Sequence, residues 1–259
     1  MMRKLNFIVL AGICTSAFFL QAYGFDSEII GDSNPFIEEQ VTNPPFEPKG
    51  LVVYSFTENP SKLTPNNDHI TRARETREYG FTRVLSSQIR QFTNVIRRYK
   101  DGDQAFQHSF KHQILAKQSK ADIEKLSMSF AGDAVNLDMA LKGKFDLLHS
   151  FVGGNFIPGK GWDQLTRIVK SRELGHVIIE MMAFSEDSGV LMDKDAINFD
   201  VNGDPGILIV IEDERGHAET SLTWADNEKT YTIQLDKNVN ANGLMASFKS
   251  LTQKISGSR

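Results

Sequence analysis

The sequence has little cysteine, little net charge and no complete catalytic motif. Cys14 is the only cysteine, so the 259-residue chain forms no disulfide within itself. Its 29 basic residues nearly balance its 33 acidic ones, and a net charge of −4 argues against a generally basic nucleic-acid-binding protein. Because 40% of the residues are hydrophobic, the chain has enough apolar side chains for a globular core and is not mainly disordered.

The N-terminus has the pattern of an export signal. Arg3 and Lys4 precede the mostly apolar residues 7–20, and residues 22–24 place small side chains where a signal peptidase reads them. We therefore predict that residues 1–24 are a signal peptide and that the protein is exported to the periplasm or the exterior. A retained membrane anchor and a lipoprotein modified at Cys14 are the alternatives. Removal of the signal leaves no cysteine, which excludes thiol nucleophiles and thiolate metal ligands.

The segment after the signal is rich in proline. Residues 25–49 hold Pro35, Pro44, Pro45 and Pro48 among acidic and polar residues, a composition that resists helix formation. We predict an extended strap or tether here, with disorder as the alternative. Residues 51–56 follow as a predicted strand.

Residues 50–170 are predicted to be rich in helix and to contain one β-hairpin. One helical face is expected from apolar residues at spacings of three and four, namely Phe81, Leu85, Ile89, Phe92, Ile96 and Tyr99. A second helix is expected from Gln104, and a short one over residues 162–170. Alternation on both sides of a Gly-Asp pair predicts a hairpin within residues 126–141, although residues 134–149 also fit a helix.

Residues 171–259 are predicted to form an antiparallel β-meander closed by an amphipathic helix. Short turns favour antiparallel neighbours over crossovers, and they separate the predicted strands 177–184, 196–201, 207–211, 218–224 and 230–235. The closing helix follows from the spacing of Leu244, Phe248, Leu251 and Ile255. The predicted class is therefore α+β, with residues 50–170 and 171–259 in one domain or in two that meet near Lys170.

Three patterns resemble ligand or metal motifs, but each lacks a residue that the chemistry needs. Residues 154–161 copy the spacing of a phosphate-binding loop, yet Gly161 stands where a hydroxyl holds Mg²⁺, so we predict a surface loop. Residues 200–204 alternate oxygen side chains as calcium loops do, but a hairpin turn explains them more simply. His108 and His112 would share a helical face without the glutamate of a zinc protease. We predict no metal and no cofactor.

One carboxylate and imidazole grouping is a candidate general base. His176 lies close in sequence to Glu173 and to Glu180, and His217 follows in the next region. No Gly-x-Ser-x-Gly elbow marks a nucleophile beside them. The sequence therefore leaves a hydrolase as an alternative and does not establish one.

An arginine ridge is the feature that we single out as a binding site. Arg83, Arg90 and Arg97 are seven residues apart, so on a helix they would lie almost opposite the apolar stripe. Residues 80–100 contain no Asp or Glu, so these arginines need solvent, acids elsewhere in the fold or an anionic partner. Arginine suits an anionic partner because its planar fork binds carboxylate or phosphate with two hydrogen bonds.

These observations favour an exported, non-enzymatic envelope or secreted protein that binds a partner. We expect the partner to be an anionic protein or an envelope component, and not a nucleic acid. A periplasmic hydrolase whose acidic and histidine groups converge only in the fold is one alternative. A carrier that holds an apolar ligand between the sheet and the helices is the other.

Overall fold

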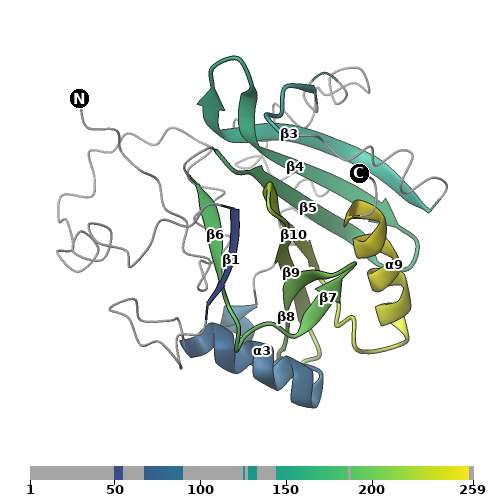
Figure 1. Ribbon diagram of the computed structural model, residues 1–259. Coiled ribbons are helices and arrows are strands. Elements are labelled where there is room, and N and C mark those ends of the chain that lie inside the picture. The colour runs from purple at the N-terminus through teal and green to yellow at the C-terminus, as the bar shows by residue number, and fades with distance from the viewer. Residues whose placement is uncertain are drawn as a thin grey trace, which may run out of the picture.

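The computed structural model describes residues 50–54, 67–89, 125, 128–132, 144–185 and 188–256. Strands make up 50% of these residues. Figure 1 shows the elements, which are β1 (Gly50–Tyr54), α3 (Asn67–Tyr79), β2 (Thr82–Arg83), the 3₁₀ helix η2 (Ser86–Gln88), β3 (Phe145–Ile157), β4 (Gly161–Ser171), β5 (Gly175–Ala183), β6 (Gly189–Asp193), β7 (Phe199–Val201), β8 (Asp204–Glu212), β9 (Ala218–Ala225), β10 (Lys229–Leu235) and α9 (Leu244–Ser256).

The strands form one large sheet and one small sheet. The large sheet has the order β2-β8-β9-β10-β5-β4-β3, and β7 pairs with β8 beside this path. It joins two antiparallel meanders, β3-β4-β5 and β8-β9-β10, through the antiparallel pair β5 and β10. Short β2 pairs in parallel with β8, and β1 pairs in parallel with β6 to form the small sheet. Residue 170 lies in β4, so the large sheet takes strands from both sides of that position.

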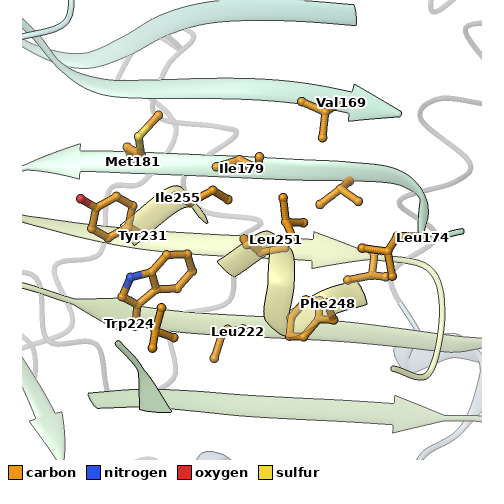
Figure 2. Close-up of a cluster of buried hydrophobic side chains, with 14 of the residues drawn as sticks. Val169, Leu174, Ile179, Met181, Leu222, Trp224, Tyr231, Phe248, Leu251 and Ile255 are labelled. Carbon is orange, nitrogen blue, oxygen red and sulfur yellow. The ribbon is translucent and has the colours of Figure 1, made fainter. Parts of the chain in front are cut away.

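One face of the large sheet packs against α9 and forms the main core (Figure 2). Helix α9 buries Phe248, Leu251 and Ile255, which recur at helical spacing and therefore share one face. The rings of Trp224 and Tyr231 stack on the sheet with centroids 4.8 Å apart. The buried side chains of this core come from both α9 and the sheet, and the carrier of an apolar ligand stays an untested alternative.

Helix α3 and the small sheet pack on the opposite face over β8. Ala73 and Thr76 are the buried residues of α3, and the Thr76 hydroxyl accepts a hydrogen bond from the Val210 amide at 3.0 Å. The Asn198 side chain donates to the carbonyls of Ala73 and Leu208, each at 2.8 Å, and accepts from the Leu208 amide at 2.7 Å. One amide side chain therefore ties α3 to β8.

The second half of the chain agrees well with its prediction. Strands β5, β7, β8, β9 and β10 overlap the predicted strands, and α9 confirms the closing helix. Strand β6 was not predicted, and it pairs in parallel with β1 outside the antiparallel sheet. The predicted turn at residues 202 and 203 is confirmed as well, since Asn202 and Gly203 have φ of +55° and +92°. The class α+β is thus confirmed in outline. Strand β1 confirms most of the strand predicted at 51–56.

The described part of residues 50–170 is not rich in helix, which corrects the prediction. The stripe expected from Phe81 fails over residues 81–89, because Gly80 ends α3 with φ of +86° and the chain then pairs with β8. Leu85 is 68% exposed there while Ile89 is buried, so the two do not share one buried face. Residues 90–99 and the helix expected from Gln104 lie outside the described residues.

Two further predictions in this region are wrong where the structure describes them. The short helix expected at 162–170 is strand β4, in which residues 165–169 are all buried. A strand that is buried on both faces shows no alternation, so its periodicity does not distinguish it from a buried helix. The hairpin expected within 126–141 is also not found at its start, where Met128 is helical and Phe130 forms only an isolated bridge to Trp162. Residues 133–143 lie outside the described residues.

In the part of the chain that the structure describes, no helix is long and apolar enough to cross a membrane.

Candidate functional site

Arg83, the one ridge arginine among the described residues, lies in β2 and not on a helix. Its guanidinium donates to the Asp213 carbonyl at 2.5 Å, lies 3.6 Å from a Glu212 carboxylate oxygen and sits 4.8 Å from the centroid of the Phe81 ring. One acid elsewhere in the fold, Glu212, thus pairs with Arg83, which was one of the alternatives that the sequence left open. Arg90 and Arg97 lie outside the described residues, and partner binding by the three arginines stays a prediction.

Asp213 is the centre of a hydrogen-bonded cluster next to Arg83. Its carboxylate accepts from the Ser86 hydroxyl at 2.7 Å, from His217 Nδ1 at 2.9 Å and from the amides of Arg215 and His217, both at 2.9 Å. Desolvation by itself would raise the pKa of Asp213, but these hydrogen bonds outweigh it and hold the pKa well below its ordinary value. The cluster therefore keeps a buried carboxylate ionised and fixes the turn between β8 and β9.

The Asp213 cluster contains Ser, His and Asp, but not in the order of a catalytic triad. The Ser86 hydroxyl donates to Asp213 and to Glu214, and His217 bonds the same oxygen of Asp213 that Ser86 does. A triad needs the imidazole between the carboxylate and the hydroxyl, so that it takes the hydroxyl proton. This arrangement instead orients a 68%-exposed His217 side chain and anchors residues 82–88 to the sheet.

Glu180 is the most perturbed acid of the large sheet. It lies in β5 on the face opposite α9, and burial raises its pKa to about 7. The register places Thr166 on one side of it and Thr232 on the other, with Thr223 beyond Thr232. Directly opposed residues of neighbouring strands have Cβ atoms about 5 Å apart, so this row brings three hydroxyls into line with the carboxyl. No group of the described residues hydrogen-bonds that carboxyl.

The carboxylate and imidazole pairs that the sequence offered as general bases are not brought together. His176 and Glu180 lie four residues apart on one strand, a separation of about 13 Å at ~3.3 Å per residue. The Glu173 carboxylate accepts a hydrogen bond from the Ser247 hydroxyl and the Glu173 carbonyl accepts one from Lys237, so Glu173 ties its turn to α9. Glu180 keeps the chemistry of a general base without an imidazole partner.

The remaining motif candidates have structural explanations or lie outside the described residues. The alternating acids at 200–204 form the confirmed turn, in which the Gly203 amide donates to Asp200 at 3.1 Å. His108 and His112 are not among the described residues. In the described ranges, no three His, Cys, Asp or Glu side chains are grouped as metal ligands would be.

The segment that resembles a phosphate-binding loop is the turn of the β3-β4 hairpin, and its glycines have structural reasons. Gly154 has φ of +78°, and a Cβ there would lie 2.0 Å from the Asp163 carboxylate. Gly161 has φ of +110°, and a Cβ there would lie 2.3 Å from the carbonyl of Ser129. Residues 129–131 run beside β4, with the amide of Trp162 donating to Ser129 and that of Ala131 donating to Trp162. The close approach of the Asp163 carboxylate at Gly154 and of the Ser129 carbonyl at Gly161 accounts for these glycines without a phosphate.

This hairpin end gathers apolar side chains at the surface. Met128 is 79% exposed and Phe156 is 59% exposed, and the Phe156 ring meets the half-buried Trp162 ring edge-on at 5.5 Å. With the half-buried Ile157, these residues make up what we call the apolar tip. No local pattern marks it, because the glycines and the lysine around it have the spacing of a phosphate-binding loop. The signal that would have found it is the near absence of charge around these large apolar residues.

Compared with protein-family models, with curated proteins and with solved structures, the chain gives no match. The functional argument therefore depends on the residues themselves.

Proposed function

We propose that the chain is an exported, non-enzymatic protein that binds a partner through the apolar tip. The observation that carries the proposal is the exposure of Met128 and Phe156 next to Trp162 at one end of the sheet. Soluble proteins seldom leave several large apolar side chains together in water unless the patch meets something. The signal-peptide pattern of residues 1–24 supports export.

The hairpin that carries the tip is held in a defined shape, which supports a binding role. The Asp163 carboxylate accepts from the Asn155 amide at 2.7 Å and from the Asn155 side chain at 3.0 Å. The Lys160 amide closes the turn by donating to the Ile157 carbonyl at 3.0 Å. A surface that is ordered before contact loses less conformational entropy on binding, so a small apolar patch binds more effectively.

Site-specific crosslinking in cells tests this proposal. A photoreactive side chain at position 156 should yield an adduct with an envelope component, whereas the same group at position 85 should not. Leu85 is a matched control because it is 68% exposed and adjoins Ser86, which is bonded to Asp213. It follows β2, which lies at the opposite end of the strand order from β3. N-terminal sequencing of the recovered protein should begin at Phe25. Equal crosslinking at both positions would remove the assignment of function to the tip.

A hydrolase is the second candidate, and Glu180 is the observation that favours it. A carboxyl with a pKa near 7 matches a general base at neutral pH, and three threonine hydroxyls share its row. Glu180→Gln would abolish such an activity while the crosslink at position 156 stayed intact. The two functions are therefore separable in one pair of variants.

A further inference from the structure

The apolar tip has a charge pattern that narrows the chemistry of its partner. Residues 128–132 and 154–163 contain two charged side chains, namely Lys160, which is exposed, and Asp163, which is half-buried and accepts hydrogen bonds from Asn155. The exposed charge of these residues is therefore a cation, although the whole chain has a net charge of −4. A surface with apolar side chains and one cation is complementary to a phosphate-bearing, apolar surface.

The tip projects from the sheet, and its backbone is internally paired. In Figure 1 the turn between β3 and β4 stands at the top of the view, above the sheet, with the segment that contains residues 128–132 beside it. The Trp162 amide donates to the Ser129 carbonyl, and the Trp162 carbonyl accepts from the Ala131 amide. The backbone amide of Lys160 donates to the Ile157 carbonyl, and Pro158 has no amide hydrogen. Entering an apolar medium exposes few unsatisfied backbone groups here, and such groups are what usually keeps a turn out of lipid.

The side chains at the tip are those that favour the boundary between water and lipid. Trp rings concentrate at membrane interfaces, Phe side chains form part of the apolar face of interfacial segments, and a lysine next to them can extend its stem to reach phosphate. The geometry points to a phospholipid bilayer as the partner: we propose that Met128, Phe156 and Trp162 enter its headgroup region. This inference rests on the proposed function, because it names the partner of the same tip.

The two tryptophans make the contact directly measurable. Trp162 lies at the tip, whereas Trp224 is fully buried in the core against Tyr231. Residues 7–20 are themselves apolar, so total binding of the full chain to vesicles is not a sufficient readout. The readout is quenching of tryptophan emission by phosphatidylcholine vesicles with brominated acyl chains, prepared with and without phosphatidylglycerol. The Trp162→Phe variant retains only Trp224 and gives the background.

Brominated vesicles should quench the full chain and leave Trp162→Phe unchanged. Phe156→Ser should raise the lipid concentration that gives half-maximal quenching about tenfold. This is the loss of affinity expected when one large aromatic side chain no longer leaves water. Leu85→Ser is the matched control and should change nothing. Added phosphatidylglycerol gives the vesicles a net negative charge and should strengthen the quenching, because the exposed charge of the tip is Lys160.

The possible outcomes distinguish this inference from the proposed function. Absence of Trp162 quenching, together with a protein adduct at position 156 in cells, overturns the lipid assignment and supports the proposed function. Absence of both quenching and crosslinking overturns both. Quenching that Phe156→Ser leaves intact also overturns the lipid assignment, because the contact would then not be made through the tip.

Discussion

The buried carboxyl of Glu180 makes the stability of the fold depend on pH in a calculable way. Burial raises the pKa of Glu180 from 4.5 to about 7, so the folded state holds its proton where the unfolded state has released it. The stabilisation is fully present below pH 4.5 and is lost as the pH rises to 7. A shift of this size corresponds to about 3 kcal/mol at ~1.4 kcal/mol per pH unit. Glu180→Gln removes the ionisation and nearly keeps the volume.

We therefore expect Glu180→Gln to lack this fall in the free energy of unfolding. Between pH 4.5 and pH 8, the free energy of unfolding of the natural chain should fall by about 3 kcal/mol more than that of the variant. The assay is urea unfolding followed by the emission of the core residue Trp224, repeated from pH 4.5 to pH 8.5. Burial lowers the pKa of His149, which lies on the same face of the sheet and also makes stability depend on pH. This contribution is common to both curves, so it cancels when they are compared.

Glu228→Gln is the matched control, since the Glu228 side chain is 76% exposed. Its pH profile should follow that of the natural chain. Parallel profiles for Glu180→Gln and the natural chain between pH 5 and pH 8 would refute the reasoning, because they would mean that Glu180 ionises alike in both states.

Three further predictions test the packing and the hydrogen bonds. Leu251→Ala should destabilise the fold by about 2–5 kcal/mol, because it leaves a cavity between α9 and the sheet. Calorimetry would measure this loss. A cost under about 1 kcal/mol would contradict the packing in Figure 2. Asn198→Ala should cost about 2 kcal/mol in urea unfolding, because it leaves two carbonyls and an amide without their partner, whereas exposed Asn240→Ala should cost less. Asp213→Asn should flatten the acid limb of the stability profile. The lowered pKa of Asp213 makes the natural chain lose stability as the pH falls below about 3.8, and an unchanged acid limb in the variant would count against the cluster.

Part of the fold could be predicted because neighbouring residues decide it. The four apolar residues of α9 follow helical spacing, so the buried face was visible before any partner was known. Asn202 and Gly203 accept positive φ more readily than other residues, which placed the hairpin turn between β7 and β8. Short turns likewise gave the antiparallel order of β8, β9 and β10.

The candidate sites depended on residues that are distant in sequence, and for that reason they were only partly predictable. Glu180 was named as a general base, but its pKa follows from burial between β4 and β10 and not from its neighbour His176. Arg83 was placed on a helix because the sequence does not show that Gly80 ends α3 and that β8 supplies Glu212. The apolar tip could not be predicted, because the role of its glycines follows from the close approach of residues 129–131 and Asp163, which the sequence does not show.

The sequence by itself determined the closing helix, the tight turn, the β-rich second half and an export pattern, because these depend on side-chain periodicity and backbone preference within a few residues. The tertiary structure decided that residues 161–171 are a strand, that Arg83 is paired and that residues 129–131 run beside the start of β4. The physical reason is that a strand satisfies its backbone with partners elsewhere in the chain, so its burial and its exposed edges are set by contacts that no local pattern contains.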